Sequence, residues 1–419
     1  MSSRSPHSPI CANEPQPYRM HVSQRYLDLT KQKLELARLP REPQGYQVQS
    51  SDFGVTKAEL EPLVDHWLEQ YDWRKQEAFY NDTLPQFRAM VNGTRLHFVH
   101  RRSHSPDAIP LLFVHGFPES FLAAAPMIEA LCDPIATPPR GTEGAQAFHV
   151  VVPSIPGFGF SDALPEEGNA MPTTAAMLDS LMKSLGYQQY IAHGTGWPSF
   201  GYRQGDLHQP GLTPPMTPGG DPRSYDRPQT LAYGLCDSPP GLLAYMLDLI
   251  QPLTYGTTFP NLQRLGPSRS PTMVRSPVTP QSGGTMSTGY QSPAVAHAIE
   301  LPGLSTVWTP TALISWTMIY WLPGPEVALR WLSNSAAVLP SLWSSHSNVP
   351  LGITYFRDST VPSSGTGQTP PQWAEAYHRV AMLTRREGRV RFPAWERPAE
   401  VVLDIRELAS IVGAASIVA

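Results

Sequence analysis

Short apolar runs that alternate with helical stretches constrain the fold of this chain more than any other feature. Residues 111–114 are continuously apolar and residues 148–152 are apolar except for His149, as expected for strands buried on both faces of a sheet. A third strand is expected at 189–192, and helical periodicity fills 119–131 and 172–185. This alternation predicts an α/β chain with a mostly parallel sheet and helices on both faces.

A long insert interrupts the alternation. Residues 211–345 read as helices and loops, and strand–helix alternation returns only near residue 349. We therefore expect a core formed by 101–210 and 346–419, with 211–345 as a helical lid.

Residues 254–305 stand out within the predicted lid. Their only charged side chains are three arginines and Glu300, and the segment is rich in Pro, Ser, Thr and Gly. Such a composition buries too little apolar surface to order a chain. The segment is expected to be a disordered insertion, or translated sequence that does not belong in the mature fold.

The N-terminal part has a different pattern. Residues 1–17 are polar and proline-rich, which predicts a disordered leader and argues against a secretory signal. Residues 18–100 are expected to form an arm of two or three helices followed by a hairpin, because Asn92-Gly93 between two apolar runs is a strong hairpin signal. Candidate N-caps of the second helical run are Ser51 and Asp52.

Composition limits the partners. The 419 residues include 31 basic and 35 acidic side chains, and the net charge of −4 gives no reason to expect nucleic acid or an anionic membrane as a partner. No apolar run approaches the roughly 18 residues that a membrane span needs. Three widely spaced cysteines predict a reducing, cytoplasmic location. No metal or cofactor is expected, and the sequence does not decide whether the protein forms a homodimer.

The first candidate site feature is the turn His115-Gly116-Phe117-Pro118. It directly follows a buried strand, so its backbone N–H groups can face a cavity and stabilise a negatively charged oxygen. The alternative is an ordinary turn between a strand and a helix.

The second feature is the turn at 193–198, which follows the third strand and leads into a helix expected near Trp197. A strained turn of this kind presents a nucleophile and needs small residues around it. Its middle residue is Gly196, which has no side chain to attack anything, and Thr195 lies on the wrong side of the turn. Without a nucleophile, an ordinary strand–helix turn is a strong alternative.

Two further side chains are candidates. Tyr320, followed by Trp321, lies in an apolar lid helix at 312–322. There a phenol facing a cavity could donate a proton, and simple packing is the alternative. Asp358 follows a predicted strand, where it could orient a base or cap a turn. No histidine follows His378, so the C-terminal loop lacks a catalytic base.

With these elements in place, the chain resembles the microsomal-type epoxide hydrolases, particularly their fungal branch. The resemblance covers most of residues 18–410 except about 254–305 and implies an α/β-hydrolase fold with an N-terminal arm and a lid. The similar blocks are specific in combination and comprise residues 96–100, 115–120, 153–162, 227–235, 237–243 and 396–398.

The resemblance also implies a reaction, the hydrolysis of an epoxide to a vicinal diol. In that family an Asp attacks the epoxide to form an ester, and a His then activates the water that hydrolyses the ester. The backbone N–H groups of Phe117 and Trp197 would hold the developing oxyanion. Tyr320 would protonate the alkoxide.

Two of the positions that match the family's catalytic residues hold residues that cannot perform their step of this reaction. Gly196 stands where the attacking Asp belongs, and Arg391 stands where the His belongs. Glycine offers no nucleophile, and arginine cannot be deprotonated to act as a base. Losing such members together typically costs about four to six orders of magnitude in rate. Asp358 lies about one residue from the register of the acid that orients the base.

Three hypotheses follow, and enzyme activity stays undecided among them. Under the first hypothesis, the chain belongs to an epoxide hydrolase lineage that acts on a small-molecule epoxide, in fungal secondary metabolism. Alternatively, it is a pseudoenzyme that binds a similar apolar ligand without turnover. The third hypothesis is a decayed or mis-assembled reading frame, which is favoured by 254–305, by a proline-rich stretch at 209–222 where a strand is expected, and by the altered motif at 387–393.

Overall fold

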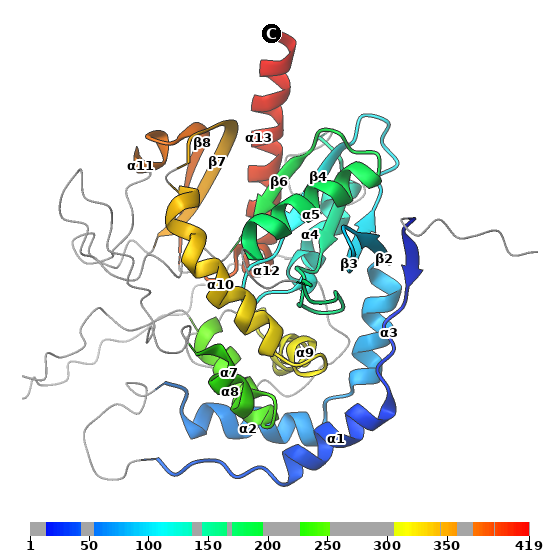
Figure 1. Ribbon diagram of the computed structural model, residues 1–419, viewed down its shortest axis with the longest axis vertical. Helices are drawn as coiled ribbons and strands as arrows, with labels where there is room; N and C mark the ends of the chain where they lie inside the picture. Colours follow the sequence, from blue (N-terminus) through cyan, green and yellow to red (C-terminus); the bar gives the residue numbers. More distant parts are fainter. Residues whose placement is uncertain are drawn as a thin grey trace, which may run out of the picture.

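The computed structural model describes residues 14–42, 54–135, 145–165, 170–195, 227–251, 306–343, 345–357, 372–388 and 390–418. These residues form two sheets with helices packed around them (Figure 1). The predictions for Gly196, Trp197, Asp358 and the segments 209–222 and 254–305 fall outside the described residues.

The N-terminal arm contains a short strand and three helices. Their bounds are β1 (Gln16–Tyr18), α1 (Gln24–Glu35), α2 (Lys57–Glu69) and α3 (Trp73–Thr83). The predicted disordered leader extends too far, because Gln16 and Pro17 pair with the next strand. The predicted N-caps of α2 are also wrong. The cap is Thr56, whose hydroxyl accepts from the backbone N–H of Glu59 in a capping box.

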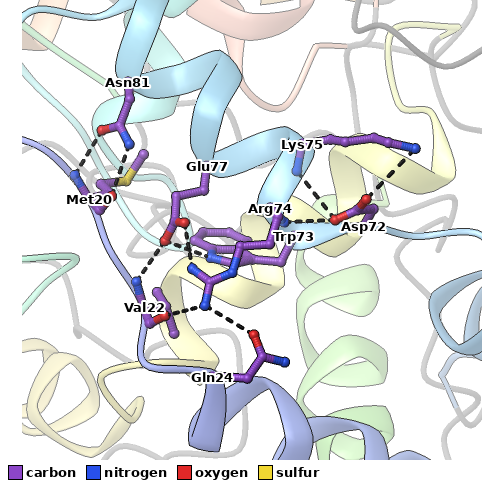
Figure 2. A network of polar contacts seen from close by, with 9 residues as sticks. All are labelled: Met20, Val22, Gln24, Asp72, Trp73, Arg74, Lys75, Glu77 and Asn81. Atoms are coloured by element: carbon purple, nitrogen blue, oxygen red, sulfur yellow. Dashed lines mark hydrogen bonds and ion pairs between the residues drawn. The ribbon is translucent and has the colours of Figure 1, made fainter.

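Polar contacts fix the arm onto α3 (Figure 2). Asn81 bonds both ways with the backbone of Met20, at 2.8 and 2.9 Å. Glu77 accepts from the backbone N–H of Val22 at 2.6 Å, while Arg74 donates to the Val22 carbonyl at 2.6 Å. The chain before α1 is therefore held by its backbone, which leaves the side chains of Met20 and Val22 free to enter the core.

The predicted hairpin is confirmed as β2 (Gln86–Val91) and β3 (Thr94–Arg101), which pair antiparallel. Asn92 and Gly93 have φ angles of 47° and 81°. Both residues of a two-residue hairpin turn need positive φ, and Asn and Gly adopt it at the lowest cost.

The hairpin joins the larger sheet, whose strand order is β1-β2-β3-β5-β4-β6. Its three remaining strands match the predicted apolar runs, and β4 pairs in parallel with both neighbours. The antiparallel pairs all involve strands of the N-terminal part. The bounds are β4 (Ile109–Val114), β5 (Phe148–Pro153) and β6 (Ile191–Gly194).

Helices follow the core strands as predicted. After β4 come η2 (Phe121–Ala124) and α4 (Ala125–Cys132), and after β5 comes α5 (Ala170–Ser184). Figure 1 shows α4 and α5 beside the larger sheet. Helix α4 contacts β5, while α5 contacts β2.

Among the described residues, the C-terminal strands form a sheet of their own. β7 (Ser347–Arg357) and β8 (His378–Glu387) pair in parallel and lie apart from the larger sheet (Figure 1). The long helix α13 (Pro398–Val418) contacts α4, β7 and β8, so it links the two sheets. The alternation of strands and helices predicted one core sheet, so the separate pairing of β7 and β8 differs from that expectation.

Four helices of the predicted lid are described. They are α7 (Pro228–Leu235), α8 (Pro239–Ile250), α9 (Pro310–Trp321) and α10 (Glu326–Trp343). Every residue of α9 from Pro310 to Tyr320 is buried, because α2 and α8 both pack against it. The two short helices α11 (Gln372–Glu375) and α12 (Pro393–Glu396) complete the described elements. None of the described helices is long and apolar enough to cross a lipid bilayer.

Candidate active site

The loop after β4 is held by a buried histidine. His115 is 2% exposed, and its Nε2 accepts from the backbone N–H of Ile155 at 3.2 Å. Its Nδ1 therefore carries the hydrogen and donates to the Gly116 carbonyl at 2.9 Å. Burial lowers the pKa of His115 to about 4, so the ring is neutral near pH 7. The histidine ties this loop to the loop after β5.

A second buried histidine fixes the loop after β5. His97 is fully buried, with Nε2 3.0 Å from the Gln86 side-chain oxygen and Nδ1 2.9 Å from the Ser154 hydroxyl. The amide oxygen can only accept, so Nε2 donates and Nδ1 accepts from Ser154. Burial and the charge of Arg88 lower the pKa of His97 to about 3. This network ties Ser154, at the start of the loop after β5, to strands β2 and β3.

Glu119 is the residue whose role the sequence analysis missed. It is fully buried, and its Oε2 accepts from the backbone N–H of Gly116 at 2.7 Å and from the Thr195 hydroxyl at 2.5 Å. Desolvation raises the pKa of Glu119, whereas these two hydrogen bonds and the charge of Arg391 lower it. Desolvation is the largest effect, and the resulting pKa is about 7. The only sequence signal was an acid directly after an oxyanion-type turn.

Thr195 also shows where the turn after β6 begins. The register pairs Gly194 with Val114, so β6 ends beside the start of the loop at His115. The bond from Thr195 to Glu119 then joins the two strand ends. Gly196 and Trp197 follow directly in the sequence but lie outside the described part of the chain.

Tyr320 reaches the same loop from lid helix α9. It is 4% exposed, and its phenol donates to the backbone carbonyl of Glu119. Its ring meets Phe117 edge to face, with centroids 5.6 Å apart and planes at 85°. Burial and the charge of Glu119 raise the pKa of Tyr320 well above its usual value, so the phenol keeps its hydrogen. The structure therefore brings together two of the predicted site residues, Tyr320 and Phe117.

Arg391 lies in the segment before α12. Its side-chain Nε donates to the carbonyl of Leu249 in α8 at 3.2 Å, and its backbone N–H donates to the Glu396 carboxylate at 2.9 Å. Its positive charge lowers the pKa of Glu119, so the guanidinium acts on the same site. The predicted base position is thus occupied by a cation that is hydrogen-bonded to the lid.

The chemistry open to this arrangement follows from the groups present. It holds the Tyr320 phenol, whose hydrogen is used on the Glu119 carbonyl, the Glu119 carboxyl group with a pKa of about 7, and the Arg391 cation. Within the ranges that the structure describes, no cluster of three or more His, Cys, Asp or Glu side chains could bind a metal ion. The predicted acid Asp358 lies outside those ranges.

Two sequence families match the N-terminal arm and the strands whose loops contribute to this site. The family described as alpha/beta hydrolase fold matches residues 109–197, and the one described as Epoxide hydrolase N terminus matches residues 15–124. The first match contains β4, β5 and β6, and the second contains the arm and the hairpin.

Solved structures show the same fold. An enantioselective mutant of the Aspergillus niger epoxide hydrolase superposes with a TM-score of 0.68 at 21% identity, covering 96% of this chain and 98% of that one. The juvenile hormone epoxide hydrolase of Bombyx mori superposes with a TM-score of 0.66 at 19% identity, covering 95% and 94%. The fold and the loop after β4 therefore define this protein as an α/β-hydrolase.

Curated relatives narrow the class. A Stigmatella aurantiaca protein with a provisional epoxide hydrolase name is 28% identical to this chain. The match covers 93% of this chain and 84% of that protein. Juvenile hormone epoxide hydrolase 2 of Ctenocephalides felis is 32% identical, but the match covers 44% of this chain and 38% of that protein. The arm, the hairpin and the first core strands are therefore similar to those of epoxide hydrolases with the α/β-hydrolase fold.

Proposed function

We propose that this protein binds a small epoxide or a similar apolar ligand between its lid and its core, and that it lacks the covalent reaction of its family. The position of Arg391 carries this proposal. The resemblance puts Arg391 at the position of the base, and Arg391 is a permanent cation that donates to the Leu249 carbonyl and has no lone pair with which to accept a proton. Gly196 offers no side chain for the attack on the epoxide.

The remaining groups support binding rather than turnover. Phe117 in the loop after β4 and Tyr320 in the lid contact each other, which supports a ligand site where lid and core meet. Without nucleophile and base, oxyanion stabilisation alone gives roughly 10³–10⁴-fold over the reaction in water. That is too little for an efficient hydrolase.

The first test measures turnover and binding on the purified full-length chain. With styrene oxide in oxygen-18 water, we expect no diol above the buffer control, but a ligand-dependent rise in melting temperature. The matched variant carries Gly196→Asp together with Arg391→His, and we expect it to form labelled diol. Diol formation by the unaltered chain at the rate of this double variant would refute the loss of catalysis. No rise in melting temperature would refute binding.

A second candidate is an active epoxide hydrolase whose reading frame is mis-assembled here. The separation of β7 and β8 from the larger sheet favours it, because an intact member of the fold joins its strands into one sheet. Sequencing the transcript across codons 190–395 tests this candidate. A message that restores an Asp and a His at the two positions supports it, and a message that matches this chain excludes it.

Three further properties are proposals from the sequence. The first is a cytoplasmic location, which is based on the sparse cysteines. The second is a homodimer. The third is a place in fungal secondary metabolism, which is based on the resemblance alone. Fractionation, light scattering and the genomic neighbourhood test them separately.

A further inference from the structure

The two oxygens of the Glu119 carboxyl group have unequal environments. Oε2 accepts two hydrogen bonds, from Gly116 and Thr195, whereas Oε1 is buried without a hydrogen-bond partner among the described residues. A buried polar atom left unpaired costs about 1–3 kcal/mol, so such an atom calls for an explanation.

Glu119 lies where three parts of the site meet. Its carboxyl contacts the loop after β4 through Gly116 and the end of β6 through Thr195. Its backbone carbonyl accepts the phenol of Tyr320 from the lid. Glu119 therefore lies where the lid meets the core, which is where the proposed function puts the ligand.

The bond from Tyr320 changes which group can donate to such a ligand. The phenol has one hydrogen, and that hydrogen is used on the Glu119 carbonyl. In the neutral carboxyl group, Oε2 already accepts two bonds, so the proton belongs on Oε1. The free donor of the site is then Oε1–H rather than the phenol.

We propose that Glu119 is a ligand-binding residue whose Oε1–H donates a hydrogen bond to an acceptor oxygen of the ligand, such as the ring oxygen of an epoxide. The inference rests on the proposed binding function and names the group that recognises the ligand. It assigns to Glu119 the contact that the resemblance assigns to Tyr320.

Charged groups around Glu119 are compatible with a neutral carboxyl group near pH 7. Arg391 lowers the pKa of Glu119 and Glu396 raises it, while burial outweighs both and brings the value to about 7. Tyr320 on α9 stays neutral because its own pKa is raised. Below that pH the carboxyl group donates, and above it the carboxylate can only accept.

The experiment compares two probes that differ in the acceptor oxygen. Styrene oxide and ethylbenzene are titrated calorimetrically into the full-length protein at about pH 5.5 and about pH 8.5, on either side of the titration. We expect styrene oxide to bind about 10-fold more tightly at the lower pH, and ethylbenzene to bind equally at both.

Variants separate the hydrogen bond from the charge. Glu119→Gln keeps an N–H donor but cannot titrate, so styrene oxide should bind at both pH values with the affinity of the unaltered protein at low pH. Glu119→Leu should lose the preference for styrene oxide over ethylbenzene. Infrared spectra of the unliganded protein give a second readout, since a protonated carboxyl band should be present at low pH and absent in the Glu119→Gln variant.

The failures of the two proposals are distinguishable. Binding of styrene oxide that is independent of pH, or the absence of a titrating carboxyl band, overturns the role of Glu119 and leaves ligand binding intact. No binding of either probe at either pH overturns the proposed function together with this inference.

Discussion

The phenol of Tyr320 donates its hydrogen to the carbonyl of Glu119, 201 residues earlier in the chain. The sequence could suggest Tyr320 as a proton donor because an aromatic residue in a lid helix has a phenol to offer. It could not show that the hydrogen is already used within the protein. At the scale of single residues, the partner of a group decides its role.

Glu77 supports a prediction at this scale. Its Oε1 accepts from Val22 and from the indole N–H of Trp73, and its Oε2 accepts from Arg74 at 2.6 Å (Figure 2). Glu77→Gln should lower the free energy of unfolding by about 2 kcal/mol, because it removes a charge-assisted bond in a buried site. Urea unfolding followed by tryptophan fluorescence measures the change.

The control for Glu77 is an exposed pair of similar chemistry. Glu61 and Lys57 are 3.2 Å apart on α2, and both side chains are about half exposed. Glu61→Gln should change the free energy of unfolding by less than about 0.5 kcal/mol. Equal effects of the two substitutions would contradict the role of Glu77 in holding the chain before α1 against α3.

Helices and strands were predictable from the sequence where the pattern that specifies them is local. The Asn92-Gly93 turn sets the register of β2 and β3 by itself, and the apolar runs locate β4 and β5. The start of α2 was placed wrongly, because Ser51, Asp52 and Thr56 are all acceptable caps in the sequence. Only the reciprocal bonds between Thr56 and Glu59 distinguish the residue that is used.

The cap of α2 gives a prediction at the scale of elements. Thr56→Ala removes the hydroxyl that accepts from the Glu59 N–H, so the free energy of unfolding should fall by about 1 kcal/mol. The matched control is Thr56→Ser, which keeps the hydroxyl and should lie close to the unaltered protein in chemical denaturation. If both variants lose the same stability, the capping bond is not the cause.

At the scale of the whole molecule, the described strands β6 and β7 lie in separate sheets where one core sheet was expected. The sequence pattern predicted these strands but could not show whether β7 joins the larger sheet, because strand pairing is decided by the tertiary fold. Helix α13 contacts both α4 and the smaller sheet, so it carries the connection instead (Figure 1).

The pH dependence of stability is a property of the whole molecule. His97 and His115 have pKa values lowered to about 3 and about 4, so below about pH 6.5 the unfolded chain binds protons that the native protein does not. Each should lower the free energy of unfolding by about 1.4 kcal/mol per pH unit as the pH falls towards 4.5. Glu119 acts in the opposite direction, because its raised pKa lets the native protein bind a proton that the unfolded chain releases above about pH 4.5.

The Glu119→Gln variant isolates this opposing effect. Between about pH 5 and 6.5 Glu119 alone contributes a slope of about −1.4 kcal/mol per pH unit, so removing it should steepen the measured slope by about 1.4 kcal/mol per pH unit. Denaturant unfolding of both proteins at several pH values measures the two slopes. Parallel curves would show that Glu119 ionises normally in the native protein.

The sequence by itself determined the α/β class, the hairpin, and the presence of a glycine at position 196 and an arginine at position 391, because these follow from local pattern and side-chain type. The tertiary structure decided the ionisation of Glu119, the use of the Tyr320 hydrogen and the attachment of Arg391 to the lid. Their partners are separated by 76, 201 and 142 residues. A pKa depends on burial and on neighbours brought together by folding, and no local pattern contains that information.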